Sequence, residues 1–387
     1  MIFGRHSVLK RGCSTWDPQQ VPQSEFQARL DAVRQEMARQ NLEALVIYGD
    51  NYSFADLCYL TNYFPKVRGG IAIVPRQGAI SLLLNIGSRD VPFAKTLTWV
   101  EDVRASNQVG GDGAKLLKEK GFEKAKIGLA DSGQGFPLPQ LEEMKRSLTQ
   151  ANWHHCHSMI APLRLVKTVQ ELTAMRQAGG VLREICDGAR EFIRPGRKEY
   201  EVVADIDRLA RDKGAEDIRI LAGEKRLNPP SFKQAANLRD HWAVYLAVQH
   251  ERYWAEAGRT YILADDAKLK EAYVRAQEIV AAMAKQLKPK GAVAAIDETA
   301  RRELGEFYAT ASVYGVANGI GLNQWEAPFL SADDARQVGA LSVGTTTLNE
   351  KMTVALRVTF ETEDKLILFG DSFEVTASGA KSLLADQ

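Results

Sequence analysis

An apolar stripe with helical spacing marks the first regular segment of this chain. It runs from Phe26 to Met37, and Ser24 and Gln27 at its start have the spacing of a capping box. Shorter apolar runs follow, and each predicts a strand: 44–48, 71–74, 79–84 and 127–130. Because strands alternate with amphipathic helices, we expect residues 23–160 to form a small α/β domain after an irregular arm, residues 1–22.

A different order of elements begins near residue 161. Thr168 and Glu171 have capping-box spacing at the start of a long helical stripe, which ends before Pro195-Gly196. Further helices are predicted at 199–213, 268–287 and up to 308, with a strand at 242–248 and strand-rich sequence after 312. Two helical pairs, each followed by strands, predict a duplicated α+β domain over residues 161–387.

The composition is that of a soluble globular protein, with 45% hydrophobic and 26% charged residues. The formal net charge of +1 provides no electrostatic attraction to nucleic acid or to an anionic membrane, so neither is expected as a partner. No apolar stretch reaches the roughly 18 residues of a membrane-spanning helix, and the N-terminus has no secretion-signal pattern. The four cysteines are scattered, which predicts reduced thiols and a cytoplasmic location.

Short motifs follow one another in a definite order over nearly the whole chain. Residues 56–61 (Asp-Leu-Cys-Tyr-Leu-Thr) are similar to an N-x-x-Y-L-T element, and Pro195-Gly196 with Glu199 is similar to a P-G-x-x-E turn. The second half adds partial matches to D-x-x-R-T, H-G-I-G-L and H-E-x-P, at 259–260, 319–322 and 326–328. In this order and spacing, the motifs resemble the creatinase, aminopeptidase P and prolidase family.

The resemblance implies an α/β N-terminal creatinase-like domain followed by an α+β pita-bread C-terminal domain. It also implies a homodimer, in which the pocket of the second domain is completed by the first domain of the partner. The expected ligand is a small-molecule substrate. Fold alone does not establish activity, so the site residues decide the chemistry.

Dinuclear members of this family hold two divalent metal ions with two Asp, one His and two Glu. Neighbouring motifs assign these five positions to the following residues of this chain: Tyr245, Glu256, Asn318, Arg357 and Gly370. Only Glu256 keeps a carboxylate, the kind of ligand that a hard divalent cation prefers. The resemblance therefore implies a member without the metal pair, and we expect neither a metal nor another cofactor.

Electrostatics explains why such ligands are lost together. Close carboxylates without a cation repel one another by roughly 4 kcal/mol per pair at a surface-like dielectric. Arg357 is cationic and is expected to pair with Glu256 across the space of the missing ions. Such a pair either stabilises the sheet or serves chemistry, in which Glu256 moves a proton and Arg357 binds a substrate carboxylate.

Five further residues are predicted to bind substrate. Arg68 lies where creatinase has an arginine that reaches the pocket of the partner subunit, and a solvated loop charge is the alternative. Asn318 is expected to donate or accept hydrogen bonds, and Trp325 either stacks on a planar substrate or fills the volume of the missing metals. The remaining two come from the matched motifs: Glu326 and Arg259.

The histidines that transfer protons in this family are absent. Residues 227–230 contain no histidine, and Trp325 occupies the position before Glu326 where the second is expected. Creatinase is metal-free but depends on the first of these histidines, so creatine hydrolysis is not expected here. Residues 154–157 (His-His-Cys-His) look like a metal site, but strand alternation would divide them between two faces.

Two functions remain open at this point. The first is a metal-independent hydrolase or lyase that cleaves a C–N or related bond in a small, carboxylated substrate, with Glu256, Arg357 and Tyr245 as catalytic residues. The second is a catalytically inactive protein that binds a small molecule or a peptide with the same fold. A metallopeptidase with a different register is disfavoured, because no histidine follows His250.

Overall fold

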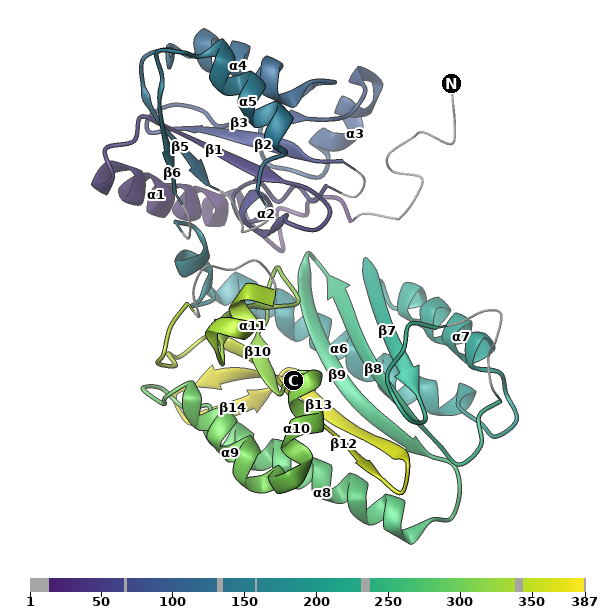
Figure 1. The fold of residues 1–387 in the computed structure, drawn as a ribbon. Coiled ribbons are helices and arrows are strands. Elements are labelled where there is room, and N and C mark those ends of the chain that lie inside the picture. Colours follow the sequence, from purple (N-terminus) through teal and green to yellow (C-terminus); the bar gives the residue numbers. More distant parts are fainter. Residues whose placement is uncertain are drawn as a thin grey trace. The chain divides into compact units, whose positions relative to one another are not determined.

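The computed structural model describes residues 14–65, 68–130, 135–156, 159–230, 237–337 and 344–385 (Figure 1). The chain separates into two compact units, and the main division lies between Arg164 and Leu165. Most of the predicted arm lies outside the described residues, which begin at Ser14. In the described ranges, no helix is both long enough and apolar enough to cross a bilayer.

The first unit is built on a mixed sheet whose described strands have the order β4-β3-β2-β1-β5-β6. The central strand β1 is antiparallel to β2 and parallel to β5, so the sheet is of the predicted α/β type. Its strands are β1 (Ala44–Gly49), β2 (Gly70–Pro75), β3 (Ser81–Leu84), β4 (Asp102–Ala105), β5 (Lys126–Ala130) and β6 (Asn152–His155).

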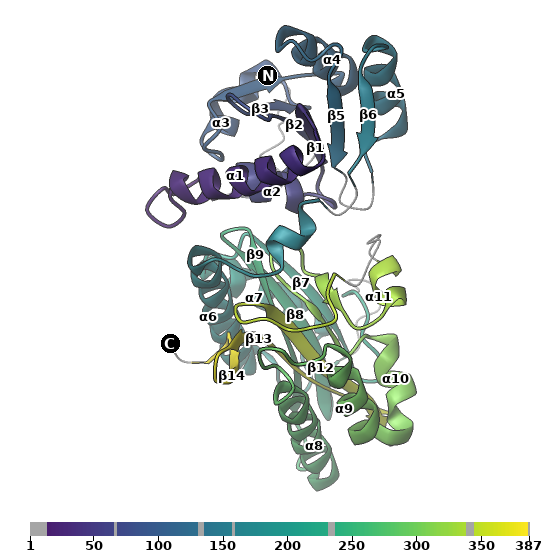
Figure 2. The same ribbon diagram turned by 90° about the vertical axis from the view of Figure 1, so that its left-hand side faces the viewer.

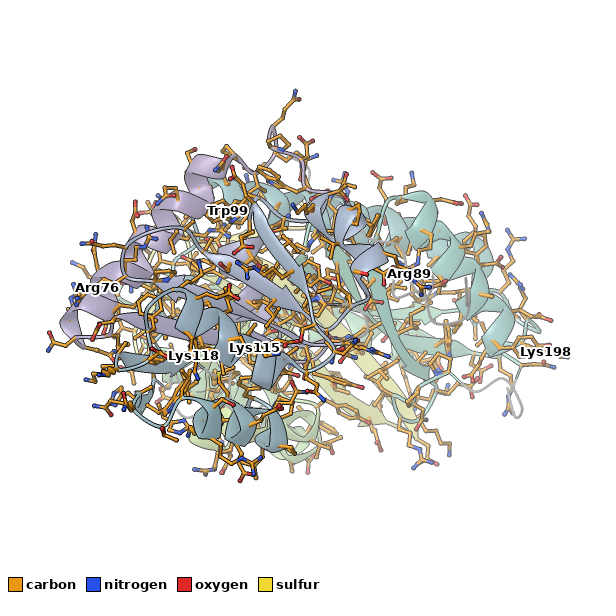
Figure 3. All side chains as sticks on the ribbon, turned by 90° about the horizontal axis from the view of Figure 1, so that it is seen from above. Arg76, Arg89, Trp99, Lys115, Lys118 and Lys198 are labelled. Carbon is orange, nitrogen blue, oxygen red and sulfur yellow. The ribbon has the colours of Figure 1, made fainter. Side chains whose placement is uncertain are left out.

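Helices cover both faces of this sheet, as Figures 1 and 2 show. Leu117 of α4 shares one core with Val46, Ile71 and Leu83 of the strands, whereas α1 and α2 pack on the other face. Lys115 and its neighbour Lys118 lie on the exposed side of α4 (Figure 3). The helices are α1 (Gln23–Arg39), α2 (Ala55–Thr61), α3 (Val91–Lys95), α4 (Val109–Glu119) and α5 (Leu138–Ser147).

The two predicted capping boxes have different outcomes. Pro22 is the N-cap of α1 and no side chain caps this helix, so the predicted box at Ser24 is wrong. The helix begins one residue before Ser24, which therefore lies inside its first turn. The box at Thr168 is confirmed: its hydroxyl accepts from the Glu171 amide at 3.2 Å, and its own amide donates to the Glu171 carboxylate at 2.9 Å.

The second unit contains a larger mixed sheet, whose described strands have the order β11-β10-β12-β13-β9-β8-β7, with β14 paired to β13. The long hairpins β8–β9 and β12–β13 form its centre, which agrees with the predicted α+β class. Its strands are β7 (Asp217–Gly223), β8 (His241–His250), β9 (Tyr253–Ile262), β10 (Ala317–Gly319), β11 (Glu326–Phe329), β12 (Thr353–Thr362), β13 (Lys365–Thr376) and β14 (Gly379–Ser382).

One face of this sheet is covered by α6 and α8 (Figures 1 and 2). Met283 of α8 belongs to the same core as Val354, Leu356 and Val358 of β12. Because side chains alternate along a strand, the odd-numbered positions of β12 face away from α8, and Arg357 is one of them. The remaining helices are α6 (Val169–Phe192), α7 (Glu199–Asp212), α8 (Ala267–Ala284), α9 (Ala294–Leu304), α10 (Tyr308–Val313) and α11 (Ala332–Gln337).

Candidate functional site

The hairpin β8–β9 brings Tyr245 and Glu256 together on the sheet face that is turned away from α6 and α8. In its register, Tyr245 is paired with Gly258 and Ala247 with Glu256, so the two side chains are diagonal neighbours on one face. The Tyr245 hydroxyl donates a hydrogen bond to Glu256 Oε2 at 2.6 Å. The eleven-residue spacing seen in the sequence thus becomes a direct contact.

Arg357 enters the same cluster from β12. Its Nη1 donates to Glu256 Oε1 in an ion pair, and its Nη2 donates to Asn318 Oδ1 at 2.8 Å. Its Nε donates to the Tyr314 carbonyl at 3.2 Å, and its guanidinium carbon lies 4.9 Å from the centre of the Trp325 ring. Only 2% of Glu256 and 4% of Arg357 are exposed, so the ion pair is shielded from water.

Gly370 lies opposite Arg357 in the β12–β13 register, at a very close approach of the two strands. A Cβ atom at position 370 would lie 2.7 Å from the Arg357 Cβ and 2.8 Å from the Leu356 carbonyl oxygen. A side chain at position 370 therefore has no space while the two strands keep this close approach.

Two members of the cluster were not predicted from the sequence. Gln324 Nε2 donates to the Tyr245 hydroxyl oxygen, and Arg219 Nη1 donates to Gln324 Oε1 at 2.7 Å. Gln324 directly precedes Trp325 of the H-E-x-P motif, so the sequence could have indicated that it lies near the cluster. Arg219 is an exposed residue of β7 and carried no such signal, because its contact with residue 324 is long-range. Together they connect the buried Glu256 with the surface.

Tyr245 is held in its protonated form. Burial raises the pKa of its hydroxyl well above the usual value, and the adjacent Glu256 carboxylate raises this pKa further. At neutral pH the phenol therefore carries its proton and acts as a hydrogen-bond donor.

The residues of this cluster do not fit a pair of divalent cations. Such a pair needs several anionic oxygen ligands, whereas the five positions provide one carboxylate, which is already paired with Arg357. In the described ranges, no group of three or more His, Cys, Asp or Glu side chains is arranged to hold a metal ion. The guanidinium provides the positive charge beside Glu256.

Arg259 does not belong to this cluster, which corrects the prediction that it binds substrate there. It is three residues from Glu256, so strand alternation places it on the opposite face of β9. Its Nη2 donates to Asp371 Oδ1 at 2.8 Å, and its Nη1 donates to the carbonyl groups of Gly258 and Gly370 at 2.8 and 2.6 Å.

The two other predicted binding residues have contacts of their own. Glu326 is buried and accepts from Lys167 Nζ at 2.9 Å, so it belongs to a second ion pair of this unit. Arg68 is an exposed residue of the first unit, and its Nη1 donates to Asn85 Oδ1 at 3.3 Å. Its expected reach into the pocket of a partner subunit stays a prediction.

The histidines do not form a metal cluster among the described residues. His154 and His155 are exposed on the edge strand β6, and His157 lies outside the described residues. His241 is buried and its Nε2 donates to the Glu224 carbonyl at 2.9 Å. Burial lowers the pKa of His241, so its imidazole is neutral at neutral pH.

Comparisons with protein families and curated proteins cover both halves of the chain. Residues 173–377 match the model of metallopeptidase family M24, and residues 29–166 match the creatinase/prolidase N-terminal domain. The Xaa-Pro dipeptidase of Pyrococcus horikoshii is 25% identical over 230 residues, which is 57% of this chain and 66% of that protein. An uncharacterized hydrolase/peptidase of Sinorhizobium fredii, y4tL, is 30% identical over 213 residues, 49% of this chain and 50% of that protein. The matches thus span between half and two thirds of these relatives.

Solved structures share the fold over almost the whole chain. The prolidase from Pyrococcus horikoshii has a TM-score of 0.75 at 20% identity, with 93% of this chain and 99% of that chain covered. The Xaa-Pro dipeptidase from Bacillus anthracis has a TM-score of 0.73 at 18% identity, with 94% and 98% covered. At such low identity, these similarities establish the architecture and leave the chemistry to the site residues.

Proposed function

This chain belongs to metallopeptidase family M24, and from that membership and its altered site we propose a metal-independent enzyme. Its substrate would be a small, carboxylated molecule in which it cleaves a C–N or related bond, by hydrolysis or elimination. The single observation that carries the proposal is the buried cluster of Tyr245, Glu256 and Arg357, in which a guanidinium stands beside the one remaining carboxylate.

Each group of the cluster has a role in this proposal. Glu256 accepts a proton from the reacting group or from water, as a general base. Tyr245 carries its proton at neutral pH and donates a hydrogen bond to charge that develops on the substrate, which requires that its hydrogen bond to Glu256 opens. Arg357 orients the Glu256 carboxylate. Together with Asn318 it binds the anionic end of the substrate, which requires that the hydrogen bond between Arg357 and Asn318 opens.

Arg68 enters the proposal through a partner subunit. As an exposed cation of the first unit, it is suited to grip a carboxylate that protrudes from the pocket of a second copy. The proposed active form is therefore a homodimer with a small-molecule substrate, and neither nucleic acid nor a membrane takes part.

The test is turnover of Xaa-Pro dipeptides and related carboxylated amides by the chelator-treated protein. We expect Glu256→Gln to lower turnover by about 10²- to 10⁴-fold, the usual contribution of a general base. Glu201→Gln is the matched control, because Glu201 lies at the surface of α7, where it pairs with Arg197 at 3.9 Å. Unchanged turnover in Glu256→Gln, or loss of wild-type turnover with the chelator, would reject the proposal.

One observation favours a second candidate, a binding protein without chemistry. Both carboxylate oxygens of Glu256 accept hydrogen bonds from the protein, and all three nitrogens of the Arg357 guanidinium donate within it. A cluster satisfied in this way has a purely structural use, since it stabilises the sheet without a ligand. Saturable binding of the same dipeptides without any turnover would favour this candidate.

A further inference from the structure

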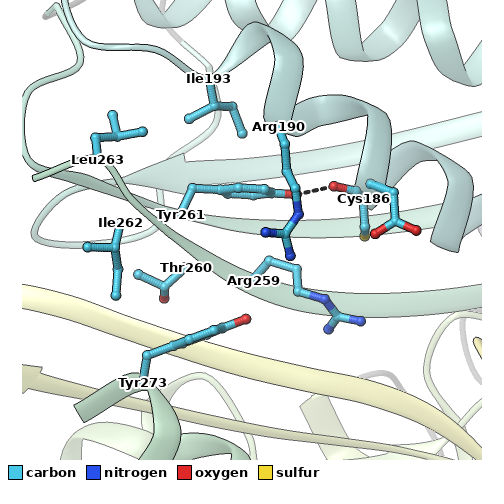
Figure 4. A pocket seen from close by; sticks show the side chains of 10 residues that line it. Cys186, Arg190, Ile193, Arg259, Thr260, Tyr261, Ile262, Leu263 and Tyr273 are labelled. Carbon is cyan, nitrogen blue, oxygen red and sulfur yellow. Dashed lines mark hydrogen bonds between the residues drawn. The ribbon is translucent and has the colours of Figure 1, made fainter. Parts of the chain in front are cut away.

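A pocket lies on the other face of the large sheet from the Glu256 cluster, where α6 and α8 pack against β9. Its volume is about 320 Å³, within the usual range for small-molecule sites. Its lining includes Arg190 and Cys186 of α6, Arg259 and Tyr261 of β9 and Tyr273 of α8 (Figure 4). Because strand alternation separates Arg259 from Glu256, this pocket is distinct from the cluster described above.

The two guanidinium groups of this pocket are held differently. Arg259 is fixed by its ion pair with Asp371 and by the carbonyl groups of Gly258 and Gly370. Arg190 is exposed and forms no hydrogen bond or ion pair with another described residue. Figure 4 shows its side chain extending from α6 toward the strand that carries Arg259. One cation is thus preorganised, while the other keeps its donors for a ligand.

Asp187 is the acid in the lining of this pocket. It is exposed on α6, three residues before Arg190, and no ion pair connects the two. The lining therefore contains two cationic side chains and one anionic side chain. Asp371 neutralises Arg259 in part, which leaves the open guanidinium of Arg190 as the main attraction for an anion.

Two aromatic rings form the walls. The Tyr261 hydroxyl donates to the Cys186 carbonyl at 2.8 Å, which fixes its ring against α6. The Tyr273 ring meets the Phe369 ring edge to face, with 5.8 Å between their centres. Burial raises the pKa of the Cys186 thiol to about 11, so Cys186 is a neutral wall residue at neutral pH. Rigid aromatic walls beside a cation are suited to a planar ligand.

We infer that this pocket binds a small planar anion. Its carboxylate or phosphate group would receive hydrogen bonds from Arg190 beside the positive charge of Arg259, and its planar body would lie against Tyr261 and Tyr273. Guanidinium groups bind both kinds of anion by the same paired donors. The inference does not depend on the proposed function, since the two sites lie on opposite faces of the sheet.

The experiment is isothermal titration of the full-length protein with benzoate, phenyl phosphate and the neutral analogue benzamide. We expect at least one of the two anions to bind, and benzamide to bind at least about tenfold more weakly, because a charge-assisted hydrogen bond is lost. Benzoate and phenyl phosphate separate a carboxylate ligand from a phosphate ligand.

Arg190→Gln should weaken binding of the anion by about tenfold or more, and Arg190→Glu should abolish it. Both variants should keep the wild-type melting temperature, because the replaced side chain is exposed and forms no bond with the described residues. Arg194→Gln is the matched control: Arg194 is exposed, lies just beyond the C-terminal end of α6 and does not line the pocket. Absence of binding by both anions, equal binding of benzamide, or unchanged binding in Arg190→Gln would overturn the inference.

Discussion

Arg357 shows how one side chain changes the electrostatics of a site. A buried guanidinium beside a buried carboxylate is stable only while both are present, because each alone is a charge removed from water. The close approach of Gly370 adds a steric condition of its own, since a larger residue there would collide with the neighbouring strand at Leu356 and at the Cβ of residue 357. The charge pairing therefore makes Glu256 and Arg357 depend on one another.

Removing one partner of this pair should be costly, whereas removing both should not. We expect Arg357→Met to lower the free energy of unfolding by about 3–5 kcal/mol, because it leaves Glu256 buried and without its counter-charge. The double variant Arg357→Met with Glu256→Leu should recover most of that loss. Urea denaturation of the two proteins measures the difference, and a single variant within about 0.5 kcal/mol of wild type would contradict the expectation.

His241 should make stability depend on pH. Its pKa in the folded protein is lowered by burial, so below its ordinary value of about 6.5 the unfolded chain binds more protons than the folded one. The stability that the neutral His241 provides is therefore complete above about pH 6.5, and it is lost as the pH falls toward the lowered pKa of the folded protein.

The measurement is the difference in melting temperature between about pH 7.5 and pH 5. His241→Gln keeps a donor for the Glu224 carbonyl but does not titrate, so this difference should be smaller than in wild type. His250→Asn serves as the control. His250 also bonds to a backbone carbonyl, that of Gly214, but it lies at the outer end of β8 and is not buried. An equal pH dependence in wild type and His241→Gln would show that His241 does not contribute.

Helices and strands are positioned here by contacts that a helical pattern does not reveal. On α6, Gly179 and Gly180 are sequence neighbours with opposite surroundings. A Cβ at Gly179 would lie 2.1 Å from the Leu383 carbonyl oxygen, whereas a Cβ at Gly180 would meet nothing within 4 Å. The first glycine allows the C-terminal segment to pack closely on α6, and the second has no such role.

Replacement of these two glycines should therefore change stability in opposite directions. Gly179→Ala should destabilise by about 1–3 kcal/mol, because the helix and the Leu383 backbone must separate. Gly180→Ala should stabilise by up to about 1 kcal/mol, because alanine loses less backbone entropy in a helix. Chemical denaturation of both variants provides the comparison, and the same sign for the two would refute this account of α6.

Over the complete chain, the architecture is shared with solved prolidases, and the second unit holds the buried ion pair of Glu256 and Arg357. Structures at 18–20% identity cover more than nine tenths of this chain, so the fold is shared although few residues are identical. A sheet retains its form when buried contacts are conserved in kind, whereas catalysis depends on a few specific groups.

Metal removal tests whether the whole protein depends on divalent ions. We expect dialysis against EDTA to leave the melting temperature unchanged, and added Mn²⁺ or Co²⁺ to stabilise the protein by less than about 1 °C, since a bound ligand stabilises only in proportion to its affinity. Elemental analysis of the purified protein should find no stoichiometric pair of divalent ions. Two equivalents of metal, or a large fall in melting temperature with EDTA, would contradict the assignment of Arg357 and Gly370 to ligand positions.

Local sequence patterns were sufficient to predict many of the helices and strands. The capping box at Thr168, the strand around Tyr245 and the helix after Phe26 depend on neighbouring residues, and these predictions agree with the structure. The capping box predicted at Ser24 is wrong because the helix begins at Gln23 with Pro22 as its N-cap, so Ser24 lies inside the first turn. Periodicity identifies an element well but locates its ends poorly.

The sequence alone predicted that Glu256 and Arg357 stand at two of the family's ligand positions, and it determined that they carry opposite charges. Only the tertiary structure decided that they are paired, that Gln324 and Arg219 connect them with the surface, and that Arg259 faces a different pocket. The physical reason is that helical and strand periodicity is local, whereas these contacts join residues separated by tens to more than one hundred positions along the chain. The register of the strands and the face on which each side chain lies determine these contacts, and a register shift of one residue moves a side chain to the other face.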